Sequence, residues 1–198
     1  FYKTCCDQLC HPLSFLFQLS FHHGFLPPVW LTAYIVPTFK KGQSSDPNNY
    51  RPIALTCTLC KIMESVVKAQ LVDYLLHNGF ISKRQHAFIN RHSTATNLLE
   101  CTFDWVVSLT KHESIDVIYV DFSRAFDSIT FNKLNIKMSS YGIEGKLLIW
   151  LRAFLYNRQQ YVVIENCFSG VADVISGVPQ GSVLGPVLFL IFINDIDS

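Results

Sequence analysis

The sequence is short of charge, because only 16% of its 198 residues are Asp, Glu, Lys or Arg, against roughly 25% in ordinary globular domains. Its net charge of +1 gives no sign of a nucleic-acid partner, so any basic groove would have to be local. The 49% hydrophobic content raises the question of a membrane protein, but no run approaches the roughly 20 apolar residues that a spanning helix needs. The best candidate, Val183–Ile193, contains Gly185 and Pro186. We therefore expect no membrane partner.

Several signatures are missing as well. There is no internal repeat, no G-x-x-x-x-G-K-[ST] loop and no N-terminal signal peptide. The seven cysteines are odd in number and irregularly spaced, which favours reduced thiols in an intracellular compartment. Cys57 and Cys60 form a C-x-x-C without a second pair at zinc-finger spacing, so we interpret them as small apolar residues at a helix start.

The pattern of apolar residues predicts an α+β fold. Helical spacing is found in five segments that end at Gly, Asn or similar stop signals. Strand-like runs lie between them, and Pro37 favours an edge position for the first of these runs. The predicted helices are 12–24, 59–77, 94–109, 131–141 and 145–156, with a last apolar helix at 183–196; the predicted strands are 29–39, 53–55, 115–120, 160–164 and 171–175.

Asp121 follows the β-branched and aromatic run Ile115–Val120, which predicts a largely buried strand. A carboxylate at the end of such a strand is costly to ionise unless a cation meets it, and Mg²⁺ is the usual cation. The alternative is a turn cap, and the local pattern alone favours the cap. Asp127, six residues on, precedes a helical segment, and a helix N-cap is its favoured interpretation.

Two further segments could bind phosphate. The turn Ser176–Ser182 contains Gly177, Pro179 and Gly181 and directly precedes a helix, where exposed backbone amides can bind an anion. The loop that starts at Lys40 and Lys41 returns to a strand near Arg51, and Arg can make bidentate contacts with phosphate. Taken singly, a plain turn and a solvated hairpin tip are the simpler interpretations.

The order of these motifs carries more information than any one of them. Along the chain come K-K-G, N-Y-R-P-I, Q-H-A-F, S-T-A-T-N-L, Y-V-D-F-S-R-A-F-D and G-V-P-Q-G-S-V-L-G-P. The series resembles the ordered motifs of the reverse transcriptases of non-LTR (LINE-type) retrotransposons. The resemblance covers residues 30–198 and implies a right-hand polymerase fold. It divides the chain into a helical lead-in at 1–29, fingers at 30–114 and a partial palm at 115–198, with the thumb absent.

The resemblance also implies roles for single residues. Asp121 matches the palm carboxylate that binds both catalytic Mg²⁺ ions, which lie about 3.5–4 Å apart in two-metal sites. The implied substrates are an RNA template, a DNA primer and deoxynucleoside triphosphates. The resemblance also implies that the protein acts in a ribonucleoprotein, in the nucleus or cytoplasm. The implied nucleotide-binding residues are Arg51, Lys40 and Lys41 at the phosphates, the amides of Phe122 and Ser123 at the triphosphate, Phe126 under the sugar, and Gln180 with Gly181 at the nucleotide and template base.

Three departures from the family pattern limit the expected activity. The aromatic-x-Asp-Asp motif is missing, since Asp195 and Asp197 belong to the loop that would lead to it. Both chain ends are expected to be cuts, and one carboxylate cannot hold two Mg²⁺ ions, so we expect this chain not to polymerise DNA. Ala87 stands where the family usually has Gly, and a positive φ there would cost energy.

Two other functions remain as alternatives. The first is a decayed, non-catalytic retroelement relic with at most residual nucleic-acid binding. The second is an unrelated Mg²⁺-dependent phosphotransferase that pairs Asp121 with Asp127, which the missing P-loop disfavours.

Overall fold

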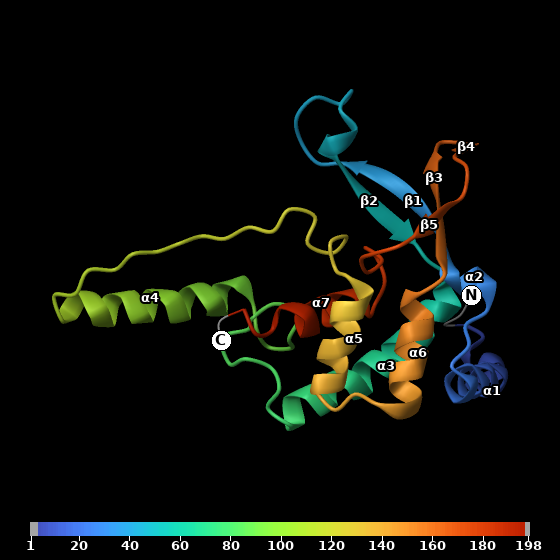
Figure 1. Ribbon diagram of the computed structural model, residues 1–198, viewed down its shortest axis with the longest axis horizontal. Helices are drawn as coiled ribbons and strands as arrows, with labels where there is room; N and C mark the ends of the chain where they lie inside the picture. The colour runs from blue at the N-terminus through green and yellow to red at the C-terminus, as the bar shows by residue number, and fades with distance from the viewer. Residues whose placement is uncertain (1–3, 197–198) are drawn as a thin grey trace.

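A computed structural model describes residues 4–196. Figure 1 shows a body of packed helices, a sheet that rises from one side of it, and a long arm that leaves the other side. The helices are, in chain order, α1 (Cys6–His23), α2 (Pro28–Leu31), the 3-10 helix η1 (Pro47–Asn49), α3 (Thr58–His77), α4 (Thr94–Thr110), α5 (Phe131–Ser140), α6 (Gly145–Leu155) and α7 (Gly185–Ile193). The strands are β1 (Thr32–Phe39), β2 (Tyr50–Leu55), β3 (Arg158–Ile164), β4 (Cys167–Phe168) and β5 (Ala172–Val174). The mixture confirms the predicted α+β class.

The sheet has the order β2-β1-β3-β4, and β5 also pairs with β3. β1 and β2 are antiparallel, and their register places Pro37 opposite Pro52. β3 runs parallel to β1 but covers only Thr32–Ile35. The edge position predicted from Pro37 is therefore correct only for the part of β1 after Ile35, which pairs with no strand on the β3 side among the described residues. The missing N–H of Pro37 breaks no hydrogen bond there.

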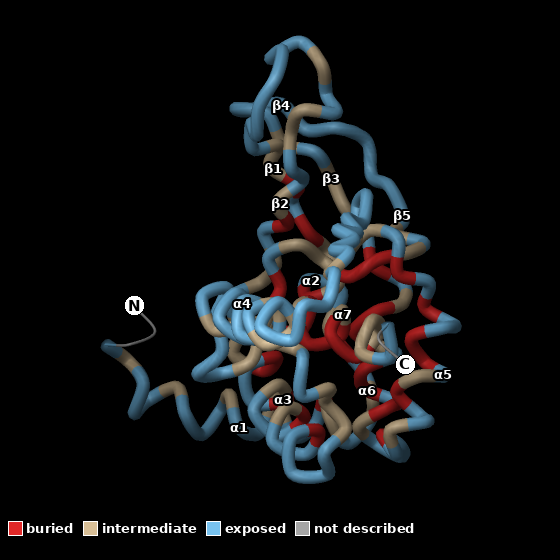
Figure 2. The backbone as a smooth tube through the Cα atoms, turned by 90° about the vertical axis from the view of Figure 1, so that its left-hand side faces the viewer, coloured by how far each residue is buried: buried red, intermediate tan, exposed pale blue. Residues whose placement is uncertain are grey.

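The main core lies among the helices. It is formed by apolar side chains of α3, α5, α6 and α7, together with Trp30 from α2. A second, small cluster of Ala33, Ile35 and Ala54 lies under the base of the hairpin. Figure 2 shows the buried residues concentrated in the helical body, whereas the far end of the hairpin is exposed. In the part of the chain that the structure describes, no helix is both long and apolar enough to cross a membrane.

The predicted strand over 115–120 is wrong. Residues 113–122 have no regular secondary structure, and Ile118, Tyr119 and Val120 are 86%, 85% and 72% exposed. A β-branched run becomes a strand only when a neighbouring strand takes up its backbone groups, and none of the strands among residues 4–196 pairs with it. In Figure 1 the segment runs back towards the body above α4, which itself buries none of its side chains.

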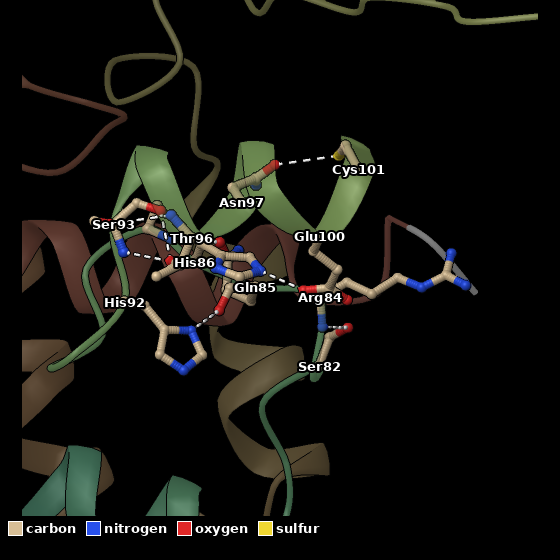
Figure 3. Close-up of polar contacts among 11 residues, drawn as sticks. Ser82, Arg84, Gln85, His86, His92, Ser93, Thr96, Asn97, Glu100 and Cys101 are labelled. Carbon is tan, nitrogen blue, oxygen red and sulfur yellow. Dashed lines mark hydrogen bonds and ion pairs between the residues drawn. The ribbon is translucent and has the colours of Figure 1, made fainter. Parts of the chain in front are cut away.

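The loop before α4 is fixed by a small polar network (Figure 3). The predicted helix start at residue 94 is confirmed, and Ser93 caps α4 in a capping box with Thr96. The ring of His86 bridges two α4 side chains, with Nδ1 2.9 Å from Thr96 Oγ1 and Nε2 2.8 Å from Glu100 Oε2. Ala87 does not have a positive φ; the strained position is Phe88, at φ 61°. The energetic cost expected for Ala87 therefore does not arise there.

Candidate active site

The Ser176–Ser182 turn, between β5 and α7, packs against residues 126–129, which follow the exposed segment 113–122. The amides of Gly177 and Val178 donate to the carbonyls of Ile129 (2.8 Å) and Phe126 (2.9 Å). On the other side, the carbonyl of Gln180 accepts a hydrogen bond of 2.7 Å from the amide of Ala54 on β2. The turn thus holds together two parts of the chain that carry predicted site residues.

Two glycines make this close approach possible. Gly177 has φ +84°, and a Cβ on it would lie 2.7 Å from the Cα of Asp127. Gly181 has φ +115°, and a Cβ on it would lie 2.6 Å from the carbonyl oxygen of Ala54. A side chain would therefore be strained in its own backbone and would also collide with backbone atoms that cannot move aside.

Gln180 and Asp127, 53 residues apart in the sequence, meet at this junction. The Nε2 atom of Gln180 lies 3.1 Å from Oδ1 and 3.2 Å from Oδ2 of Asp127. The predicted N-cap role of Asp127 is wrong, since α5 begins after Thr130 and has no side-chain cap. The carboxylate of Asp127 is bonded to Gln180 instead of a helix N-terminus, and no local sequence pattern identifies so distant a partner.

Phe126 lies beside this pair in an aromatic cluster. Its ring stacks on Phe189 of α7 with centroids 4.8 Å apart, and Phe88 meets it edge-on at 6.2 Å. The backbone of Phe126 is held by Val178, as described above. The predicted site residues Phe126, Gln180 and Gly181 are therefore brought together, whereas no local sequence signal identified Phe88 and Phe189.

The amides at the start of α7 are not open for a phosphate, which agrees with the plain turn that the local pattern favours over an anion site. Oε2 of Glu64, on α3, accepts from the amides of Val183 (2.7 Å) and Leu184 (3.0 Å). The hydroxyl of Ser182 accepts from the amide of Gly185 at 3.0 Å. The anion that these amides bind is a carboxylate of the protein itself.

Glu64 is fully buried. Burial raises the pKa of this carboxyl, and the hydrogen bonds from Leu184 and Val183 lower it in part. Arg158, buried nearby, donates to the carbonyls of Phe154 and Trp30 at 3.1 and 3.4 Å, and burial lowers its pKa. The available sequence signal was an acidic residue on the apolar face of α3, next to Cys60, Met63 and Val67, all of them buried.

The basic residues lie on the β1–β2 hairpin. Lys40 and Lys41 are exposed in its loop, and Arg51 is exposed on β2. Arg124, in the turn before Phe126, donates from Nη2 to Oδ1 of Asn48 in that loop, at 3.2 Å. This contact brings the loop that carries the basic residues next to the turn that carries Phe122 and Ser123, both exposed.

Comparison with known proteins decides the family. Residues 39–198 match the family model described as reverse transcriptase (RNA-dependent DNA polymerase). The chain belongs to the reverse transcriptase family. Its relatives include proteins of non-LTR retrotransposons, as the order of the motifs predicted.

Three relatives show how far the similarity to this reverse transcriptase domain extends. The RNA-directed DNA polymerase from mobile element jockey of Drosophila funebris is 30% identical, over 97% of this chain and 21% of the relative. The probable RNA-directed DNA polymerase from transposon BS of Drosophila melanogaster is 28% identical, over 93% of this chain and 20% of the relative. The Pol polyprotein from type-1 retrotransposable element R1 of Bradysia coprophila is 27% identical, over 91% and 18%. The chain thus spans about a fifth of the length of these curated relatives.

The reverse transcriptase family implies divalent metal ions, so the fit of this chain to such a site matters. Asp121 is exposed and lies outside any strand. Within residues 4–196 no three His, Cys, Asp or Glu side chains are grouped closely enough to hold a metal ion. Asp195 is paired with Lys137 on α5, and Asp197 lies outside the described residues. The described donors therefore do not form a two-metal centre.

Proposed function

We propose that this chain is part of an RNA-directed DNA polymerase and supplies its nucleotide-binding surface. The reaction would be attack of a primer 3′-hydroxyl on the α-phosphorus of a deoxynucleoside triphosphate, with release of pyrophosphate, on an RNA template. In this proposal residues 30–114 are the fingers and 115–198 belong to the palm of a right-hand polymerase, with 1–29 leading into the fingers. Family membership supports the chemistry, and the described contacts support the location of the site.

One observation carries the location. The Ser176–Ser182 turn carries Gln180, whose side chain bonds to Asp127, and its Val178 amide bonds to the backbone of Phe126, so distant parts of the sequence meet at one junction. An aromatic ring beside an amide is suited to a nucleoside, because the ring packs on the sugar while the amide hydrogen-bonds. We propose that Phe126 contacts the sugar and that Gln180 and Gly181 contact the nucleotide and the template base.

We propose that the triphosphate lies between the β1–β2 hairpin and the turn that carries Phe122 and Ser123. Arg51, Lys40 and Lys41 are exposed cations on the hairpin, and charge-assisted hydrogen bonds are the strong ones. The amides of Phe122 and Ser123 belong to the turn that Arg124 ties to the hairpin loop. Asp121 would provide one ligand of a Mg²⁺ site, which needs further ligands from elsewhere.

Equilibrium binding of radiolabelled dTTP to the chain, with Mg²⁺ present, tests the nucleotide site. Arg51→Ala is expected to weaken binding by about tenfold, the size of one charged hydrogen bond. Arg152→Ala, a substitution of an exposed arginine on α6, is the matched control and should leave the affinity unchanged. Equal loss in both variants would mean non-specific charge attraction, and no saturable binding by the wild-type chain would count against the site.

The alternative is a retroelement relic that binds nucleic acid without catalysis. The exposed Asp121, with no neighbouring group of acidic side chains within the described residues, favours it. Primer extension on an RNA template separates the two, using the chain alone and within its full-length parent protein. Activity that depends on Asp121 supports the polymerase, and inactivity of the parent supports the relic.

A further inference from the structure

The Asp127–Gln180 pair goes beyond the roles proposed above, because it determines which end of the Gln180 amide faces a ligand. A carboxylate can only accept hydrogen bonds. Both of its oxygens lie within 3.2 Å of one amide atom of Gln180, Nε2. The NH₂ end of the amide is therefore fixed towards Asp127, and the carbonyl end is turned away from it.

The carbonyl end is available. Among the residues that the structure describes, Oε1 of Gln180 has no hydrogen-bond partner, and the side chain is only half-buried. The backbone on both sides of Gln180 is fixed, since its own carbonyl is bonded to Ala54 and Gly181 packs on the same residue. Asp127 is fixed as well, because its carbonyl accepts from the hydroxyl of Ser176 at 3.0 Å. An amide held in this way needs little reorganisation when a ligand arrives.

We infer that Asp127 is a positioning residue, which orients the Gln180 amide so that Oε1 is presented as an acceptor to a donor group of the bound nucleotide. The inference rests on the proposed function, because it assigns the ligand of the same site. The donor is either the 3′-hydroxyl of the sugar or an N–H of the base. Without Asp127 the amide can turn over, and its NH₂ end then meets the donor of the nucleotide, which makes no hydrogen bond.

The orientation can be tested without a nucleotide. The side-chain amide signals of Gln180 in a ¹⁵N-labelled chain, identified by their loss in Gln180→Ala, should shift in Asp127→Ala, which removes the acceptor. Asp173→Ala is the matched control, because Asp173 accepts from Nε2 of Gln159 at 3.1 Å in another Asp–Gln pair on the sheet. Gln180 signals that stay in place in Asp127→Ala, with the fold intact, would overturn the inference.

The consequence for binding is tested with dTTP and Mg²⁺. Asp127→Ala, which removes the acceptor, should weaken binding by about three- to tenfold, the size of one net hydrogen bond, and Asp173→Ala should not. Dideoxy-TTP separates the two donors: if it binds wild type and Asp127→Ala equally, the donor is the 3′-hydroxyl, and if it shows the same loss, the donor is on the base. Unchanged dTTP affinity in a folded Asp127→Ala chain would overturn the inference.

A swapped pair gives the sharpest test. Gln180→Glu alone places two carboxylates against each other and should abolish measurable binding. Adding Asp127→Asn restores a donor opposite an acceptor, with an oxygen of residue 180 still facing outwards. The double variant should therefore recover dTTP binding to within about tenfold of wild type, and a double variant no better than Gln180→Glu would contradict the inference. If wild type binds no dTTP, the proposed function fails, and the Gln180 signals alone decide the pairing.

Discussion

Glu64 in α3 and Leu184 at the start of α7 are joined by a buried hydrogen bond of 3.0 Å between a carboxylate oxygen and a backbone amide. The same oxygen accepts from Val183. Because α7 follows directly on the Ser176–Ser182 turn, this carboxylate fixes the return of the chain from the candidate site into the core. Its effect on Gln180 is indirect, through the backbone.

We expect Glu64→Ala to destabilise the fold strongly. The substitution leaves two buried amides without an acceptor, which corresponds to about 2–4 kcal/mol of unfolding free energy. Denaturant unfolding followed by circular dichroism measures the loss. Glu100→Ala, which removes a half-exposed carboxylate bonded to His86, should cost less than about 1 kcal/mol. Equal losses would show that the buried amides find other partners.

The pH dependence of Glu64 has a definite sign. Its pKa in the folded state is raised above the usual 4.5, mainly by burial. A raised carboxyl pKa means that the folded state binds the proton more tightly. The stability that this group contributes is therefore present below pH 4.5 and is lost as the pH rises through the raised value.

The variant Glu64→Gln isolates this effect, because its amide oxygen can still accept from both backbone amides. Relative to wild type, the variant should gain about 1.4 kcal/mol for each pH unit between the usual and the raised pKa. Melting curves of the two chains across pH 4 to 8 measure the difference. A constant difference over that range would mean that the carboxyl titrates normally when folded.

The glycines of the turn can be tested directly. Gly181→Ala should cost about 1–3 kcal/mol, because φ is +115° and the new Cβ would lie 2.6 Å from the carbonyl oxygen of Ala54. Gly170→Ala is the control, since nothing lies within 4 Å of its Cβ position and its φ is not positive. Thermal unfolding compares the two. A stable Gly181→Ala chain would show that the turn relaxes away from β2.

The sequence predicts the fold well where information is local. The helices over 59–77, 131–141 and 145–156 were identified to within one or two residues, because apolar spacing and stop residues act within a single turn. The start of α4 at residue 94 was predicted for the same reason. The last helix is shorter than predicted and ends at Ile193, since a continuous apolar run does not mark its own boundaries.

What the sequence did not predict depends on distant partners. Asp127 is a residue type typical of a helix N-cap, but it is bonded to Gln180. Glu64 lies on an apolar helix face, but its carboxyl group accepts from backbone amides at the start of α7. The family resemblance predicts which residues belong to the site, while the contacts between them came only from the structure. The Ile115–Val120 run also depends on a distant partner, because a strand-like sequence without a neighbouring strand stays exposed.

That exposed run gives a final prediction. Ile118 is 86% exposed, so Ile118→Asp should change the unfolding free energy of this chain by less than about 0.5 kcal/mol. In a buried strand the same change would leave an unpaired charge in the core and cost several kcal/mol. Ile129→Asp, at a site with 0% exposure eleven residues later, is the matched control and should prevent stable folding. Chemical denaturation of both variants checks the pair, and a large loss in Ile118→Asp would mean that the run is covered in solution, for example by a second copy of the chain.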